Sequence, residues 1–329
     1  MDWVVLYLNR ATKDLYRVMG EEAPPELRLL FLDAGGPDEI REKLPQADAI
    51  LIADAALTAE MILRASRLKM VQHQGVGYER IDVKALAKAG VPLALCPAGT
   101  AEAVGEHTVL LMLAALKRLV AAHASMVAGQ WLMWELRPST RDLHGKTVGL
   151  IGFGRTGRAV AKRLRGFDVR LIVNDPYITL SEREKAEFGV TLVEKDALLR
   201  EADIVSLHVP LTEETRHLIA GPELQRMKRE AVLINVSRGG VTDQDALYEA
   251  LRERRILGAG LDVYSPEPLP AGHPLTRLDN VVLTPHVAAG TLDAFRAKMR
   301  FALGNIARFK GGEEPLERAP TPSARVPGT

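Results

Sequence analysis

Three side chains with the chemistry of a proton-transfer site follow short apolar runs in the second half of the chain. They are Arg238, Glu267 and His286, which come after the runs 231–236, 259–263 and 281–283. An imidazole can take a hydroxyl proton as hydride leaves the carbon and return it in the reverse reaction. A carboxylate beside the ring raises the pKa of the histidine, and a guanidinium can hold a substrate carboxylate. These residue types predict hydride transfer at a carbon that bears oxygen.

Each of these residues also has a structural explanation when it is taken singly. Arg238 could bind a pyrophosphate or a surface acid, Glu267 could be an exposed turn residue, and His286 could be a core histidine. The other histidines are interpreted as structural, because a lone histidine carries little information. They are His73, His107, His123, His144, His208, His217 and His273. No HExxH motif and no paired-cysteine pattern predicts a catalytic metal.

A glycine-rich turn stands between an apolar run and a helical pattern near the middle of the chain. Residues 147–151 predict a buried strand, and Gly152-Phe153-Gly154-Arg155-Thr156-Gly157 follows directly. In a dinucleotide-binding turn, Gly152 permits the tight strand-to-helix turn and Gly154 lets backbone amides approach a pyrophosphate. Gly157 lets the helix lie close to the strand. The spacing therefore predicts a Rossmann unit.

An acidic residue follows the second predicted strand of this Rossmann unit, the position from which a carboxylate binds the adenosine ribose. The next apolar run, 169–173, ends in Asn174-Asp175, and a carboxylate there can accept hydrogen bonds from the hydroxyls of the adenosine ribose. The charge of Asp175 would repel a ribose 2′-phosphate, and Pro176 and Tyr177 offer no cation to neutralise one. NAD is therefore predicted in preference to NADP. The structural alternative is a glycine-rich turn with a helix-capping aspartate.

Short apolar runs that alternate with helical segments must position these residues. In the first part of the chain they are 4–8, 28–32, 49–52, 69–73 and 91–94. In the second part they are 147–151, 169–173, 190–193, 204–208, 231–236, 259–263 and 281–283. This alternation is typical of parallel sheets covered by helices. We predict an α/β fold with two doubly wound parallel-sheet domains.

Two long helices and a polar tail complete the predicted fold. Residues 100–122 form a helical pattern that is apolar over most of its circumference, so this helix needs burial on several sides. A last helix, 291–309, is expected to return to the first domain. The tail from Gly311 is rich in glycine, proline and charge, which favours disorder.

Composition limits the class of protein and its partners. A chain of 329 residues is long enough for two domains, and its formal net charge of +1 gives no general attraction to nucleic acid. Cys96 is the only cysteine, which excludes an intrachain disulfide and favours the reducing cytoplasm. Neither the N-terminus nor the apolar run 108–116 has the pattern of a signal peptide or a membrane span.

A series of motifs along the chain resembles the D-isomer-specific 2-hydroxyacid dehydrogenases. The motifs are Gly75-Val76-Gly77 with Ile81-Asp82, Val104-Gly105-Glu106-His107, Gly152 to Gly157 with Asp175, His208-Val209-Pro210-Leu211-Thr212, Asn235-Val236-Ser237-Arg238-Gly239, Leu261-Asp262-Val263 with Glu267-Pro268, and Thr284-Pro285-His286. The resemblance covers almost the whole chain. It implies a Rossmann NAD-binding domain, residues 99–287, inserted in a flavodoxin-like substrate domain, residues 1–98 and 288–329, with closure of the two domains during turnover.

The resemblance also implies a role for individual residues. Arg238, Glu267 and His286 become the catalytic residues, and the backbone amides of Val76 and Gly77 hold the substrate carboxylate together with Arg238. A purely structural turn is the alternative for that loop. The implied cofactor contacts are Val104, Gly152, Gly154, Arg155, Thr156, Gly157, Asp175, Val209, Pro210, Val236, Ser237, Asp262, His286 and Ala288.

A homodimer formed through the cofactor domains is a further implication of the resemblance. Helix 100–122 and the segment Trp131-Leu132-Met133-Trp134 are the apolar candidates for its interface. An intramolecular core is the alternative for both segments.

We therefore predict an NAD-dependent D-2-hydroxyacid dehydrogenase that acts on a small 2-oxo acid such as glyoxylate or hydroxypyruvate. A phosphorylated substrate is disfavoured, because residues 50–58 contain no base where phosphoglycerate dehydrogenases often carry an Arg-Ser pair. Formate is disfavoured because Glu267 stands where formate dehydrogenases of this superfamily carry Gln. Phosphite oxidation and an NAD-sensing protein similar to transcriptional corepressors remain the alternatives.

Overall fold

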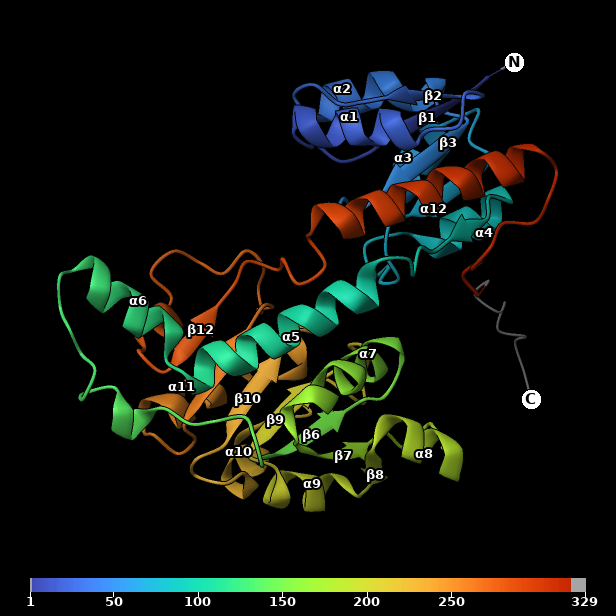
Figure 1. Ribbon diagram of the computed structural model, residues 1–329. Coiled ribbons are helices and arrows are strands. Elements are labelled where there is room, and N and C mark those ends of the chain that lie inside the picture. The colour runs from blue at the N-terminus through green and yellow to red at the C-terminus, as the bar shows by residue number, and fades with distance from the viewer. Residues whose placement is uncertain (1, 321–329) are drawn as a thin grey trace. The chain divides into compact units, whose positions relative to one another are not determined.

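The computed structural model describes residues 2–320 and divides the chain into two compact units (Figure 1). Unit 1 comprises Met1–Thr100 and Leu292–Thr329, and unit 2 comprises Ala101–Thr291. Both are α/β units built on a parallel sheet, which confirms the predicted fold class.

The borders of the units lie a few residues beyond the predicted ones, which were 98/99 and 287/288. Gly99 belongs to unit 1 because its backbone packs on the last helix, where a β-carbon would come within 2.8 Å of the carbonyl oxygen of Ala294. Ala288 belongs to unit 2 because its amide donates to Asp262 Oδ2 at 2.9 Å.

Unit 1 contains a five-stranded parallel sheet in the order β2-β1-β3-β4-β5, the flavodoxin-like order. The strands are β1 (Trp3–Tyr7), β2 (Leu27–Leu30), β3 (Ala49–Ile52), β4 (Met70–His73) and β5 (Leu93–Ala94). One face packs on α1 (Lys13–Glu22) and α12 (Leu292–Lys310) through a cluster that includes Met19 and Leu303. The other face packs on α2 (Pro37–Lys43), α3 (Ala59–Arg64) and α4 (Val83–Ala89).

Unit 2 contains a seven-stranded parallel sheet in the order β12-β11-β10-β9-β6-β7-β8, which is the Rossmann order with one added strand. The strands are β6 (Thr147–Ile151), β7 (Arg170–Asn174), β8 (Val190–Leu192), β9 (Ile204–Leu207), β10 (Val232–Asn235), β11 (Gly258–Leu261) and β12 (Val281–Leu283). Helices α5 (Thr100–Leu116), α7 (Arg155–Leu164) and α8 (Glu182–Phe188) cover one face. Helices α9 (Lys195–Glu201), α10 (Gly221–Arg226) and α11 (Gln244–Arg252) cover the other.

The prediction of one helix over 100–122 is wrong. Helix α5 ends at Leu116, and a second helix, α6, runs over Leu119–Val127. Between them Arg118 takes the left-handed conformation with φ 54°, which is uncommon for a residue other than glycine. Its guanidinium donates to Asp279 Oδ2 at 2.9 Å, so a tertiary ion pair favours the break.

The prediction of disorder from Gly311 is wrong for residues 311–320. The amide of Leu95 donates to the carbonyl of Glu317, and the amide of Ala319 donates to the carbonyl of Leu93. These hydrogen bonds place the segment beside β5, where its backbone groups find partners and Ala319 is buried. Residues 321–329 lie outside the described part of the chain.

Within residues 2–320, no single helix has the length and apolar character needed to cross a membrane; only α5 and α6 taken together do, and they are bent by 64°. The same residues contain no group of three histidine, cysteine or acidic side chains placed to hold a metal ion.

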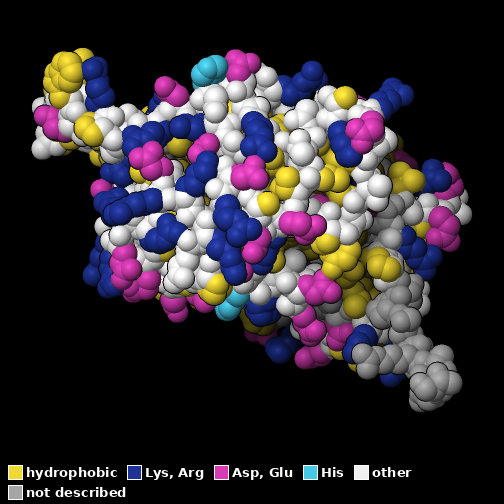
Figure 2. All heavy atoms as spheres, turned by 90° about the horizontal axis from the view of Figure 1, so that it is seen from below, with side chains coloured by type: hydrophobic (Ala, Val, Ile, Leu, Met, Phe, Trp, Pro, Cys, Tyr) yellow, Lys and Arg dark blue, Asp and Glu magenta, His cyan; other side chains and the backbone are white. Residues whose placement is uncertain are grey.

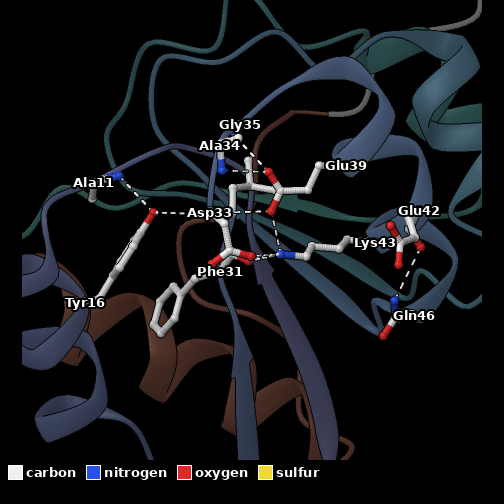
Figure 3. A network of polar contacts seen from close by, with 11 residues as sticks. Ala11, Tyr16, Phe31, Asp33, Ala34, Gly35, Glu39, Glu42, Lys43 and Gln46 are labelled. Carbon is white, nitrogen blue, oxygen red and sulfur yellow. Dashed lines mark hydrogen bonds and ion pairs between the residues drawn. The ribbon is translucent and has the colours of Figure 1, made fainter.

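A carboxylate anchors the loop after β2 in unit 1 (Figure 3). Glu39 accepts hydrogen bonds from the amides of Asp33, Ala34 and Gly35 at 2.6, 3.0 and 2.7 Å. The ammonium group of Lys43 donates to Glu39 at 2.5 Å and to the carbonyl of Phe31 at 2.7 Å. The hydrogen bond from Lys43 and those from the amides lower the pKa of Glu39 to about 2.

We expect Glu39→Gln to lower the melting temperature at neutral pH by a few degrees. Because the folded-state pKa of Glu39 lies below its ordinary value of 4.5, its stabilising effect is present above pH 4.5 and is lost as the pH falls toward 2. Melting curves of wild type and variant should therefore differ at pH 7 and converge at low pH. Glu42→Gln, on the same helix and exposed, is the matched control, and an equal loss in both variants would contradict the assignment.

Candidate active site

The predicted site residues of unit 2 follow the carboxyl ends of its strands. Because all the strands are parallel, these ends lie on one edge of the sheet. The strand order reverses between β6 and β9, and ligands of doubly wound sheets bind at such a switch point. Gly152 follows β6, Arg238 follows β10 and His286 follows β12.

The structure pairs His286 with Glu267. His286 Nδ1 lies 2.8 Å from Glu267 Oε2, and Glu267 Oε1 accepts a hydrogen bond from the amide of Tyr264 at 2.9 Å. The two side chains are 50% and 35% exposed, so the pair is open to a ligand. Because Nδ1 is engaged by the carboxylate, Nε2 is the ring nitrogen that can exchange a proton with a ligand.

The pair also sets the protonation of both groups. The hydrogen bond that His286 donates to Glu267 raises the pKa of His286, against the opposing effects of burial and of the Arg238 charge. Burial raises the pKa of Glu267. The hydrogen bonds from His286 and Tyr264 and the charges of His286 and Arg238 lower it by more than burial raises it, so the pKa lies below its ordinary value. An ionised Glu267 and a protonated His286 therefore stabilise each other.

The charge of Arg238 acts on this pair, and the loops that follow β10 and β11 are in close contact. A β-carbon on Gly239 would lie 1.9 Å from the carbonyl oxygen of Tyr264, so only glycine allows this approach. Arg238 Nη1 donates to the carbonyl of Ser237 at 2.8 Å, and its charge acts on both Glu267 and His286. The structure thus brings together the three residues that the sequence suggested for hydride transfer.

Asp262 holds the loop that carries His286. This fully buried carboxylate accepts hydrogen bonds from Thr284 Oγ1 at 2.6 Å and from the amides of Val287 and Ala288 at 2.9 Å each. The amide of His286 donates to the carbonyl of Asp262 at 2.8 Å, and His286 has φ 55°. Such a conformation needs support from its surroundings, which Asp262 supplies.

The sequence predicted only a cofactor contact for Asp262 and a structural role for His107. His107 Nε2 lies 3.0 Å from Thr284 Oγ1 and 3.6 Å from Asp262 Oδ1, so it belongs to the same network. The sequence carried one signal: the apolar runs that end at Leu261 and Leu283 are each followed by a polar residue. The structure then shows that these two leucines are neighbours in the register of β11 and β12.

The glycine-rich turn fits a dinucleotide pyrophosphate. Gly152 has φ 90°, and a β-carbon there would lie 2.6 Å from the carbonyl oxygen of His208. A β-carbon on Gly157 would lie 2.4 Å from the carbonyl oxygen of Gly152, whereas one on Gly154 would meet nothing within 4 Å. Helix α7 begins at Arg155 with no acidic residue in its first turn, so its N-terminus can attract a phosphate.

Asp175 lies beside this turn at the end of β7. Its Oδ2 accepts a hydrogen bond from the amide of Phe153 at 2.8 Å, and its Oδ1 accepts one from the amide of Tyr177 at 3.0 Å. Two carboxylate oxygens offer about four acceptor positions, so capacity for ribose hydroxyls remains. The predicted alternative of a helix-capping aspartate is wrong, because the N-cap residues of the neighbouring helices α7 and α8 are Gly154 and Ser181.

The remaining predicted cofactor positions differ in burial. Val104, Val236 and Ala288 are buried in the same hydrophobic cluster as Phe153, where they can form an apolar wall of the predicted cofactor site. Val209 is half-buried, Pro210 is exposed, and Ser237 donates to Asn235 Oδ1 at 2.9 Å.

The predicted carboxylate-binding residues Val76 and Gly77 belong to unit 1. They follow β4, and the side chain of Val76 is 50% exposed.

Known proteins resemble the chain over most of its length. Residues 109–288 match the NAD binding domain of the D-isomer specific 2-hydroxyacid dehydrogenases. A glyoxylate reductase of Korarchaeum cryptofilum is 40% identical over 299 residues, which are 90% of this chain and 86% of that protein. A hydroxypyruvate reductase of Thermotoga maritima is 37% identical over 79% of this chain and 83% of its own. The crystal structure of the TT0316 protein from Thermus thermophilus superimposes with a TM-score of 0.84 and 32% identity, covering 96% of this chain and 99% of that one.

The identity to these relatives extends well beyond the glycine-rich turn, and the matched segment contains the turn, Asp175 and the three residues at the strand ends. The chain belongs to the D-isomer-specific 2-hydroxyacid dehydrogenases, and its second unit is their NAD-binding domain.

Proposed function

We propose that the protein is an NAD-dependent oxidoreductase that reduces a small 2-oxo acid to the D-2-hydroxy acid, with glyoxylate or hydroxypyruvate as substrate. The observation that carries the proposal is the His286–Glu267 pair, with Arg238 acting on both groups, at the same sheet edge as the glycine-rich turn. Relatives named glyoxylate reductase and hydroxypyruvate reductase support this substrate class.

In the proposed reaction, the glycine-rich turn and Asp175 would hold NADH, which would supply hydride to the carbonyl carbon. His286, protonated through its pairing with Glu267, donates a proton from Nε2 to the carbonyl oxygen, so that the C=O bond becomes a C–OH bond. Arg238 binds the substrate carboxylate and polarises the carbonyl group. In unit 1, the amides of Val76 and Gly77 are proposed to bind a substrate carboxylate.

We further propose that the protein acts as a homodimer in the cytoplasm. Apolar side chains remain exposed on α6 and on the segment after it, with Val127 at 75%, Trp131 at 73% and Trp134 at 65% exposure. Exposed aromatic residues of this kind are typical of protein interfaces. The buried single thiol of Cys96 supports a reducing compartment.

The charge pattern of the surface supports a small-molecule substrate over a nucleic acid. On the face that Figure 2 shows, Lys and Arg side chains are interspersed with Asp and Glu side chains. The formal net charge is +1. A nucleic-acid site would need a continuous basic stripe.

Replacing His286 with Ala should remove the proton donor and lower kcat for 2-oxo acid reduction by about 10²- to 10⁴-fold. The dissociation constant for NADH, measured by fluorescence, should stay within a few fold of wild type. Undiminished turnover of glyoxylate and hydroxypyruvate would refute the assigned role. If wild type oxidises phosphite with NAD and reduces neither acid, the proposed substrate class is wrong.

The pH dependence should report the His286–Glu267 pair. Because Glu267 raises the pKa of His286, kcat/KM for reduction should be maintained up to the raised pKa and fall as the pH rises through it. Glu267→Gln removes the charge, so the alkaline fall should move to lower pH. Glu201→Gln, which alters an exposed carboxylate paired with Arg170, should leave the profile unchanged; identical profiles for wild type and Glu267→Gln would contradict the pairing.

Asp175 should set the preference for NADH over NADPH. Asp175→Asn keeps an acceptor for the amide of Phe153 but removes the charge that repels a 2′-phosphate. We expect the ratio of kcat/KM for NADH to that for NADPH to fall by about tenfold or more, since a hydrogen bond to a charged group contributes about 1.5–3 kcal/mol. An unchanged ratio would show that another residue selects the cofactor.

Replacing Trp131 and Trp134 together with Asp should convert the dimer to a monomer in light-scattering measurements. Leu63→Asp, which alters another exposed apolar side chain at 82% exposure, should leave the mass unchanged. A wild-type mass of one chain would exclude the dimer.

A further inference from the structure

A buried histidine at the end of β4 connects two loops of unit 1. His73 is the last residue of β4 and is 7% exposed. Its Nδ1 accepts a hydrogen bond from the amide of Gly75 at 2.9 Å, and its Nε2 lies 2.6 Å from the carbonyl oxygen of Ala53, just after β3. One imidazole thus ties the end of β3 to the loop that contains Val76 and Gly77.

These two contacts define the tautomer of His73. The amide of Gly75 can only donate, so Nδ1 must be the unprotonated acceptor. The ring proton therefore resides on Nε2, which donates to the carbonyl of Ala53. A β-carbon on Gly75 would lie 3.2 Å from His73 Cε1, so the absence of a side chain at Gly75 lets the loop lie close to the ring.

The segment just before Val76 is held from other directions as well. The amide of Gln74 donates to the carbonyl of Ile52 at 2.8 Å, and the hydroxyl of Tyr7 donates to Gln74 Oε1 at 3.1 Å. The carbonyl of Gly75 accepts from the amide of Cys96 at 2.8 Å. The backbone of Gly75 is therefore held at its amide by His73 and at its carbonyl by Cys96, and Gly75 directly precedes Val76.

We propose that His73 is a positioning residue that orients the amides of Val76 and Gly77 toward the substrate carboxylate. This inference rests on the proposed function, in which these amides bind that carboxylate. Anion binding by backbone amides depends on their direction, and a displacement of about 1 Å in a binding group can cost a large factor in rate. His73 acts through the loop and touches no reacting atom, so its loss should weaken substrate binding more than it slows hydride transfer.

Two substitutions separate this role from a purely structural one. His73→Asn places an amide oxygen near the position of Nδ1 and can still accept from Gly75. His73→Leu removes both nitrogens and leaves the amide of Gly75 without its partner. Asn305→Ala is the matched control, because Asn305 is a buried residue of unit 1 that bonds to Gln72 and Leu316 and not to the loop.

The experiment measures KM and kcat for glyoxylate and hydroxypyruvate, the dissociation constant for NADH, and the melting temperature. His73→Leu should raise KM by about tenfold, the effect of losing one net hydrogen bond, with a smaller change in kcat and unchanged NADH binding. His73→Asn should restore most of the wild-type KM. Asn305→Ala should lower the melting temperature without raising KM.

Three results would overturn the inference. One is an unchanged KM in His73→Leu, and another is a KM that rises equally in Asn305→Ala, which would show that lost stability alone is responsible. The third is wild-type protein that reduces no 2-oxo acid, which would overturn the proposed function together with the inference. Active wild type with an unaffected His73→Leu variant would overturn the inference alone.

Discussion

The fully buried carboxylate of Asp262 is the interaction on which the proposed chemistry depends. Three hydrogen bonds from Thr284, Val287 and Ala288 terminate on its two oxygens. They hold the loop after β12 in a path that gives His286 a left-handed backbone and directs its ring to Glu267. Removing one partner of a buried hydrogen-bonded carboxylate is costly, so this loop has little freedom to adopt another path.

The same edge of the sheet combines rigid backbone contacts with a pair of titratable groups. Gly239 allows the loops that follow β10 and β11 to approach each other closely, and the charge of Arg238 acts on both Glu267 and His286. Arg238 opposes protonation of His286, while Glu267 favours it more strongly. The net effect is a raised pKa for His286, which favours the protonated ring that the proposed reduction uses.

Much of the fold could be predicted because its strands are short and apolar, and most of them are buried. The predicted bounds of 49–52, 147–151 and 281–283 coincide with observed strands, and the residues after the strands could be placed on one edge because the sheet is parallel. The break at Arg118 could not be predicted, because it depends on an ion pair with Asp279, which is distant in sequence. The pairing of residues 311–320 with β5 could not be predicted for a similar reason, because composition does not reveal which distant backbone groups a segment bonds to.

For the candidate site, residue types suggested the chemistry, but the hydrogen-bond network behind the site could be seen only in the structure. Asp262, His107 and His73 are single polar residues whose partners come from other segments, so their spacing along the chain carries little signal.

A crystal structure with NADH and oxamate, an unreactive analogue of a 2-oxo acid, would test the central claim most directly. We predict that Arg238 contacts the oxamate carboxylate and that His286 Nε2 lies within hydrogen-bond distance of the oxygen that corresponds to the substrate carbonyl. We also predict that Nδ1 remains paired with Glu267. Oxamate bound away from Arg238, or a His286 ring turned away from it, would contradict the account.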